Sequence, residues 1–181
     1  MRKALLADDD FLVRSYLKML SSWEKAGFEI TADVRDGEEA LEVLDREKID
    51  LVVTDIAMPL MDGIELIREI RRKYPDIYVI VLSCHDEFEY VKKAMKEGAD
   101  EYVLKNTLNE ESLYTVLEAA EEHIRQSKEE AGVKDQKQQT QEHADMKKDP
   151  EEDNNADADG KTGEKSDQTG NMNEKFLFFN Q

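Results

Sequence analysis

Residues 4–10 read Ala4-Leu5-Leu6-Ala7-Asp8-Asp9-Asp10, an apolar run of strand length that ends in three acids. Three later apolar runs also end on a residue suited to handling a phosphoryl group: residues 51–54 before Asp55, residues 78–82 before Ser83, and residues 102–104 before Lys105. The C-terminal ends of parallel strands open into one crevice, so residues far apart in sequence can converge there. We therefore predict that carboxylates, a hydroxyl and one ammonium surround a common point.

Strand-type runs alternate with amphipathic helical patterns up to about residue 130, which predicts βα units and a parallel sheet. The predicted strands are residues 3–7, 28–34, 51–54, 77–82 and 101–104. The first, third and fourth are almost entirely aliphatic, as expected for strands covered on both faces, whereas the second and fifth carry charges and suit less covered positions. The clearest helix carries apolar residues at helical spacing, namely Leu113, Val116, Leu117, Ala120 and Ile124.

The composition is strongly acidic. The 181 residues carry a formal net charge of −18, with 38% charged and 39% apolar residues. Nucleic acid and anionic lipid would both be repelled by such a surface, so we expect this chain to bind neither directly. Cys84 is the single cysteine and cannot form an internal disulfide. No apolar stretch reaches membrane-spanning length, and the first residues do not read as a signal peptide, so we expect a cytoplasmic protein.

The character of the sequence changes after Gly132. Residues 133–175 contain no aromatic and almost no aliphatic residue. Such a segment buries too little apolar area to offset its chain entropy, so we predict that it is disordered. We accordingly place a folded domain at residues 1–127 and an acidic polar linker or tail at residues 128–181, which ends near the apolar stretch Phe176-Leu177-Phe178-Phe179.

The predicted cluster has a distinct chemistry. Asp8, Asp9 and Asp55 would place three like charges within a few ångströms, where they repel and raise one another's pKa. A divalent cation removes this conflict, and Mg²⁺ favours a few carboxylates together with a phosphate. Lys105 would supply a second positive charge and Ser83 a hydrogen-bond donor. A phosphoryl group in this crevice needs positioning and charge neutralisation more than covalent help.

Residues 1–127 resemble the receiver domain of the response regulators of bacterial two-component systems. The resemblance rests on the acids after the first strand, the acid and the Met-Pro motif after the third, and three residues at the last two strand ends. These are Asp8-Asp9-Asp10, Asp55, Met58-Pro59-Leu60-Met61-Asp62-Gly63, Ser83, Tyr102 and Lys105. The resemblance implies a flavodoxin-like (βα)5 three-layer α/β sandwich whose parallel sheet has the strand order 2-1-3-4-5.

The resemblance also implies a role for each acid of the cluster. Asp55 would accept a phosphoryl group from the phosphohistidine of a sensor histidine kinase. Asp8 and Asp9 would hold Mg²⁺ together with Asp55 and the backbone carbonyl of Ala57. The protein would then be a phosphoacceptor switch rather than an enzyme, with at most self-catalysed phosphotransfer and autodephosphorylation.

Other residues would read or tune the phosphoryl group. Lys105 would contact it, and Ser83 would turn towards it so that Tyr102 can rotate inwards. This motion would remodel the face formed by the fourth helix, the fifth strand and the fifth helix, through which a homodimer or another partner could bind. Ala57 and His85 are similar in position to the residues that influence, in receivers, how fast the aspartyl phosphate hydrolyses, although a loop histidine is also commonly just a solvated residue.

The sequence departs from the family pattern after the lysine, where receivers usually have a proline in a cis peptide bond. Here Asn106 follows Lys105. A cis bond before a non-proline residue costs about 2.5–4 kcal/mol, so we expect either a trans bond or a locally strained loop. The segments 88–91 and 98–102 are most similar to receivers that precede AraC-type helix-turn-helix domains. A transcriptional output would then lie in sequence missing from this chain or in a partner.

Three alternatives belong to other classes. A pseudo-receiver would keep the fold and bind proteins without being phosphorylated; the intact acids and Lys105 argue against it, and Asn106 argues slightly for it. A Mg²⁺-dependent phosphatase is disfavoured because no second Asp stands two residues after Asp55. A flavin-binding relative is disfavoured because the acidic loop after the first strand would repel a phosphate in the absence of a metal.

Overall fold

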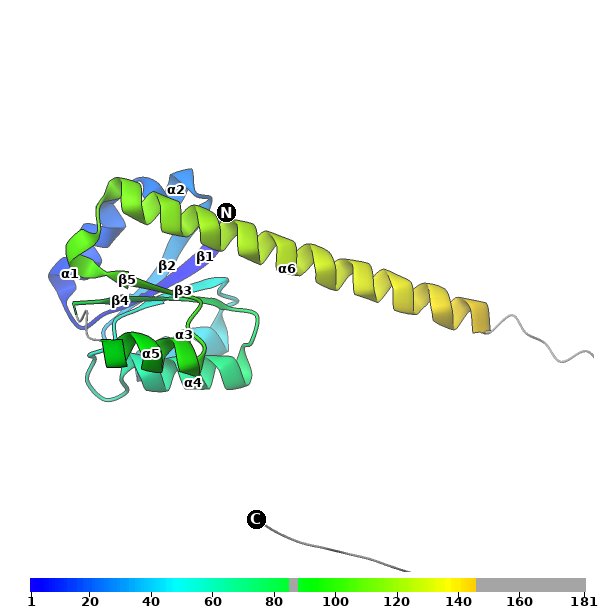
Figure 1. The fold of residues 1–181 in the computed structure, drawn as a ribbon, viewed down its shortest axis with the longest axis horizontal. Helices are drawn as coiled ribbons and strands as arrows, with labels where there is room; N and C mark the ends of the chain where they lie inside the picture. Colours follow the sequence, from blue (N-terminus) through cyan, green and yellow to red (C-terminus); the bar gives the residue numbers. More distant parts are fainter. Residues whose placement is uncertain (85–87, 146–181) are drawn as a thin grey trace, which may run out of the picture. The chain divides into compact units, whose positions relative to one another are not determined.

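A computed structural model describes residues 1–84 and 88–145 and contains a five-stranded parallel sheet of order β2-β1-β3-β4-β5 (Figure 1). The strands are β1 (Arg2–Ala7), β2 (Phe28–Val34), β3 (Leu51–Thr54), β4 (Tyr78–Ser83) and β5 (Glu101–Leu104). The helices are α1 (Phe11–Met19), α2 (Ser22–Lys25), α3 (Gly37–Arg46), α4 (Gly63–Lys73), α5 (Phe88–Glu97), the 3₁₀ turn η1 (Lys105–Thr107) and α6 (Glu110–Asp145). The predicted fold class and strand order are confirmed.

The burial of each strand follows its composition. All residues of β3 and β4 are buried, as are the last four residues of β1. The edge strands β2 and β5 are mostly half-buried, which agrees with the charges in their sequences. The central strands therefore read as continuous aliphatic runs because helices cover both of their faces.

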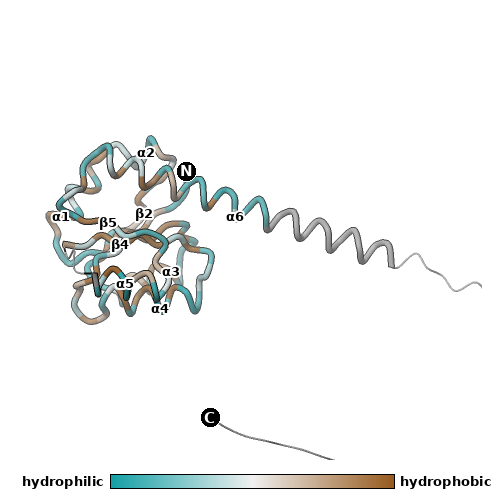
Figure 2. Tube along the Cα trace, in the orientation of Figure 1, coloured by the Kyte–Doolittle hydropathy of each residue, from teal (hydrophilic) through white to brown (hydrophobic). Residues whose placement is uncertain are grey.

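Two apolar layers sandwich the sheet. One contains buried residues of α3, α4 and α5, and the other contains buried residues of α1, α2 and α6. Figure 1 shows the two groups of helices on opposite sides of the strands. The predicted apolar stripe of α6 lies in the second layer, where Leu113, Leu117, Ala120 and Ile124 are buried. Figure 2 shows hydrophobic residues along the central strands. It shows hydrophilic residues in the turns of α6 that come after its buried apolar stripe.

Helix α6 does not end at residue 127, where the sequence suggests a domain boundary, but continues to Asp145. Residues 126–145 are rich in Gln, Glu and Lys, which are good helix formers even without an apolar face. Arg125 also pairs with Glu122 at 2.6 Å and with Glu129 at 2.9 Å, one turn away on either side. The predicted tail is thus helical up to Asp145, and residues 146–181 lie outside the described part of the chain.

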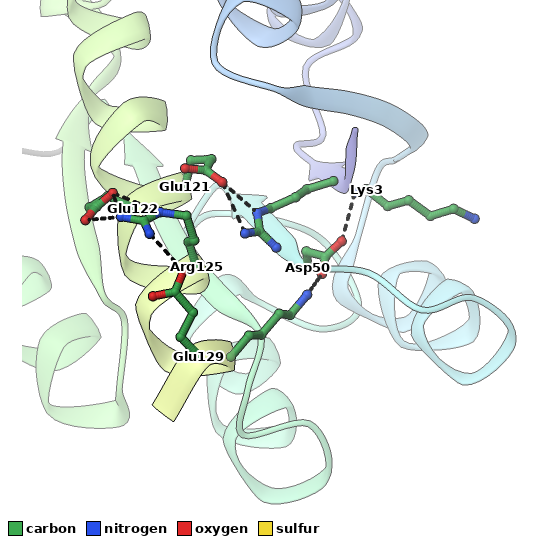
Figure 3. Close-up of polar contacts among 8 residues, drawn as sticks. Lys3, Asp50, Glu121, Glu122, Arg125 and Glu129 are labelled. Carbon is green, nitrogen blue, oxygen red and sulfur yellow. Dashed lines mark hydrogen bonds and ion pairs between the residues drawn. The ribbon is translucent and has the colours of Figure 1, made fainter. Parts of the chain in front are cut away.

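Polar contacts hold α6 against the end of the sheet at which the strands begin (Figure 3). The Asp50 carboxylate accepts hydrogen bonds from the backbone N–H of Lys3 at 3.0 Å and from the Lys128 ammonium at 2.6 Å. The Arg2 guanidinium pairs with Glu121 at 3.1 Å. The acidic residues lie at the opposite end of the sheet, where β1 and β3 end. None of the described helices is both long and apolar enough to cross a membrane.

Candidate functional site

Three carboxylates meet at the C-terminal edge of the sheet. Asp8 and Asp9 directly follow β1, and Asp55 directly follows β3. Each offers one oxygen, and these oxygens all lie within 4.8 Å of one another. Asp8 and Asp55 are buried, whereas Asp9 is exposed. Because β1 and β3 are neighbours in register, with Ala7 opposite Thr54, their strand ends deliver the acids to one place.

Lys105 reaches the same point from the end of β5. Its ammonium lies 2.6 Å from Asp8 Oδ2 and 2.9 Å from Asp55 Oδ2. The lysine opens the 3₁₀ turn η1, which is closed by a hydrogen bond from Thr107 Oγ1 to the Leu104 carbonyl at 2.9 Å. The asparagine that follows the lysine lies within this turn, and the turn places Lys105 at the cluster.

The cluster holds more negative than positive charge. Burial raises the pKa of the Asp8 carboxyl above its ordinary value, the hydrogen bond and charge of Lys105 oppose this rise, and the Asp55 charge adds to it. Burial lowers the pKa of Lys105, but its hydrogen bonds with Asp8 and Asp55 outweigh burial, so that the pKa of Lys105 is raised. The single positive charge of Lys105 therefore cannot neutralise both negative charges of the buried carboxylates Asp8 and Asp55.

Backbone contacts hold Asp55 in place. Its Oδ1 accepts a hydrogen bond from the Ile56 N–H at 2.7 Å, and its own N–H donates to the Ala7 carbonyl at 2.8 Å. The Thr54 hydroxyl donates to the Asp55 carbonyl at 2.9 Å. The loop after Asp55 returns beside it, because the Gly63 N–H donates to the Ile56 carbonyl at 2.9 Å.

This donor set fits a hard divalent cation. The three ligands are carboxylate oxygens, the ligand type that Mg²⁺ prefers, and they carry the excess negative charge that a cation would neutralise. Asp8, Asp9 and Asp55 are thus the residues that could hold the ion. Ala57 lies two residues beyond Asp55 in an exposed part of the loop.

Ser83 and Tyr102 lie on the neighbouring strands β4 and β5. Ser83 ends β4, is fully buried, and lies opposite Leu104, the residue before Lys105. Tyr102 on β5 is half-buried against the apolar layer of α3, α4 and α5. His85 lies outside the described residues.

Sequence reasoning missed two residues beside the cluster. Thr54 bonds the carbonyl of Asp55, and Arg14 on α1 donates to the carbonyl of Asp8. Asp10, by contrast, acts only as the expected helix cap, because its side chain accepts from the Leu12 N–H at 2.8 Å. A half-buried arginine on α1 could have been noticed from its place beside Val13 and Leu17 in the apolar stripe, but its partner follows only from the fold.

The excess charge predicts an unusual pH dependence. Without metal and near neutral pH, Asp8→Asn should raise the free energy of unfolding by on the order of 1 kcal/mol, because it removes a buried acid whose charged form is disfavoured. The folded-state pKa of Asp8 is raised, so its destabilising effect is present at neutral pH and disappears as the pH falls through that pKa. The difference between the two proteins should therefore shrink towards acid pH.

Urea unfolding of both proteins in EDTA, at neutral and acid pH, measures this difference. Asp33 and Asp50, whose pKa values are lowered by hydrogen bonds from Lys18 and Lys128, lose stabilising charge in acid, but equally in both proteins. Added Mg²⁺ should reverse the order, because the wild type would gain binding free energy that Asp8→Asn lacks. A variant less stable than wild type at neutral pH would contradict the charge argument.

Comparison with known proteins identifies the relatives of this chain. The family model described as the response regulator receiver domain matches residues 4–118. The uncharacterized transcriptional regulatory protein YesN of Bacillus subtilis (strain 168) is 39% identical over 118 residues, which are 65% of this chain and 32% of that protein. The transcriptional regulatory protein DegU of Brevibacillus brevis is 40% identical over 101 residues, 56% of this chain and 42% of that protein. The chain thus spans less than half the length of these two relatives.

Solved structures give the same result. The REC domain of AraT, a response regulator from Geobacillus stearothermophilus, has a TM-score of 0.64 and 34% identity, and the match covers 70% of this chain and 98% of that one. A DNA-binding response regulator of the LuxR family from Staphylococcus aureus has a TM-score of 0.59 and 31% identity, with 66% and 99% covered.

Proposed function

The chain belongs to the response-regulator receiver family, and we propose that it is a phosphorylation-dependent switch whose phosphoacceptor is Asp55. The observation that carries this proposal is the pairing of buried Asp55 with Lys105 at 2.9 Å beside Asp8 and Asp9. A nucleophilic carboxylate, a fixed ammonium and a pair of further acids are the groups that phosphoryl transfer to an aspartate requires. As a receiver domain, the chain is a signalling module rather than a classical enzyme.

The proposed reaction transfers the phosphoryl group of a sensor kinase's phosphohistidine. A carboxylate oxygen of Asp55 bonds to phosphorus while the phosphorus–nitrogen bond breaks, and the released imidazole nitrogen takes up a proton from water. Lys105 pairs with a phosphoryl oxygen in place of the Asp55 oxygen it now contacts. Asp8, Asp9, Asp55 and the Ala57 carbonyl would hold Mg²⁺, which when bound neutralises the charge of the carboxylate and the phosphoryl group.

Phosphorylation would then bias a conformational equilibrium. Ser83, buried at the end of β4, would bond the phosphoryl group, and half-buried Tyr102 would move further in. The face of α5, β5 and α6 would change and support homodimerisation or partner binding; Tyr90 and Met95 of α5 are partly exposed there. Ala57 and His85 would set the lifetime of the aspartyl phosphate.

Helix α1 begins directly after Asp10, so its first residues lie beside the acids that the kinase must approach. Phe11 and Leu12 there have exposed fractions of 65% and 74%, and they directly follow the acids. These side chains offer apolar contact to the sensor histidine kinase. The strong negative charge speaks against contact of this chain with DNA or a membrane surface.

The output would be transcriptional, as in the named relatives, through a DNA-binding region outside this chain or in a partner. Residues 1–127 would form the receiver and residues 128–181 a linker that begins within α6. The relation to AraC-type regulators stays a prediction.

A phosphodonor assay tests the proposal. The protein is incubated with Mg²⁺ and acetyl phosphate, and mass spectrometry should detect one added phosphoryl group that is stable in acid and removed by hydroxylamine. EDTA should prevent its formation. A wild-type protein that gains no adduct would contradict the switch and favour a pseudo-receiver that acts by protein binding alone.

A further inference from the structure

The side chain of Arg14 bridges the acidic cluster to the neighbouring strand. One terminal nitrogen of its guanidinium donates to the backbone carbonyl of Asp8, and its Nε lies 3.1 Å from Asp33 Oδ2 on β2. The guanidinium carbon also stands over the Phe11 ring, 5.8 Å from its centroid. Only 13% of the Arg14 side chain is exposed. A long cationic side chain is thus held in one position at the base of the site.

The Asp8 carbonyl needs such a donor. Strand β1 ends at Ala7, which is the last residue paired with β2, and the N–H of Asp8 still donates to the Val34 carbonyl at 3.1 Å. The carbonyl of Asp8 lies beyond these ladder contacts in a buried residue, where an unpaired acceptor would be costly. With Val34 on one side and Arg14 on the other, the backbone of Asp8 cannot rotate freely.

Asp33 in turn anchors Arg14. Its carboxylate also pairs with the Lys18 ammonium at 2.8 Å. The hydrogen bond from Lys18, followed by that from Arg14, holds the pKa of Asp33 below its ordinary value despite partial burial, so Asp33 stays ionised near neutral pH. The guanidinium is planar and can bond two acceptors through two different nitrogens at once, which the single nitrogen of a lysine ammonium cannot reproduce in the same geometry.

We propose that Arg14 is a positioning residue that fixes the direction of the Asp8 carboxylate and thereby sets the Mg²⁺ affinity of the cluster; this inference rests on the proposed function. Asp8 reaches Lys105 through Oδ2 and the Asp10 N–H through Oδ1 only while its backbone is held. Outer residues that orient metal ligands typically change metal affinity by about 10–100-fold when they are replaced. Arg14 acts on the backbone of the ligand, so its effect falls at the lower end of this range.

The test is Arg14→Lys in the full chain, titrated with Mg²⁺ by calorimetry. We expect the Kd for Mg²⁺ to rise about tenfold, because the guanidinium that bonds both the Asp8 carbonyl and the Asp33 carboxylate is lost. Lysine keeps the positive charge, so the electrostatic repulsion of the metal stays nearly the same. Lys18→Met is the matched control, because Lys18 contacts Asp33 but not Asp8, and its Kd should stay close to that of the wild type.

Two further measurements separate positioning from simple stabilisation. Asp33→Asn should weaken Mg²⁺ binding in the wild-type background but hardly at all in the Arg14→Lys background, because both changes break the same bridge. Urea unfolding in EDTA shows whether Arg14→Lys remains folded at the temperature of the titration. If this variant is less stable yet binds Mg²⁺ as tightly as the wild type, Arg14 has a structural role only and the inference is wrong.

The phosphodonor assay distinguishes this failure from that of the proposed function. A wild type that forms the adduct, together with an unchanged Kd in Arg14→Lys, overturns the positioning role alone. A wild type that neither binds Mg²⁺ nor forms the adduct overturns both.

Discussion

Asp55→Asn is expected to abolish phosphoryl uptake from acetyl phosphate completely. The carboxamide has no anionic oxygen to bond to phosphorus, yet it has nearly the same shape as the carboxylate. The oxygen of asparagine can still accept the hydrogen bond that the Ile56 N–H now donates to Asp55 Oδ1, so the loop should keep its conformation. The substitution also removes one of the three negative charges that repel one another in the cluster, so we expect no decrease in the free energy of unfolding. Mass spectrometry after incubation with Mg²⁺ measures the adduct.

Asp10→Asn is the matched control for this experiment. Asp10 stands beside the cluster but serves as the N-cap of α1, and asparagine caps a helix about as well as aspartate. This variant should therefore form the adduct as the wild type does. An adduct that persists in Asp55→Asn would show that another residue, such as exposed Asp9, is the acceptor and that the assignment of Asp55 is mistaken.

The residue pattern was sufficient to predict a parallel α/β sheet and the meeting of the acids, for a simple physical reason, whereas the strand order came from the resemblance to the receiver family. Aliphatic runs long enough for buried strands, alternating with amphipathic helices, permit few arrangements, and the C-terminal ends of parallel strands lie at one edge. Asp8, Asp55 and Lys105 each directly follow such a run, so their convergence depends on topology alone and not on details of packing.

Contacts that depend on packing could not be predicted in the same way. The bridge from Arg14 to Asp8 requires a particular rotation of α1 on the sheet, and sequence spacing does not specify that rotation. The length of α6 was missed because its later turns lack an apolar stripe, although their residues have high helix propensity. The pairing of one lysine with two acids likewise follows from the turn η1, whose sequence departs from the family pattern.

Gly63→Ala is expected to lower the free energy of unfolding by about 3 kcal/mol, the upper end of the usual cost of overpacking. A methyl group at this position would lie 2.0 Å from the carbonyl oxygen of Asp55 and 2.9 Å from the Cα of Ile56. These are backbone atoms that cannot swing aside, because the Asp55 N–H is bonded to the Ala7 carbonyl at 2.8 Å and the Gly63 N–H to the Ile56 carbonyl at 2.9 Å. The strain therefore falls on the peptide that carries the phosphoacceptor.

Gly27→Ala separates this steric effect from the general cost of replacing a glycine. Gly27 has a φ of 83° but no described atom within 4 Å of an added methyl group, so alanine there meets conformational strain without a clash, at a cost of about 1–2 kcal/mol. Urea unfolding of the two variants compares the costs directly. Phosphoryl uptake should slow in Gly63→Ala and stay unchanged in Gly27→Ala, because Asp55 is displaced only in the first. Equal losses of stability in both variants would mean that the start of α4 can shift away from Asp55, so that the added methyl group does not press on the Asp55 carbonyl.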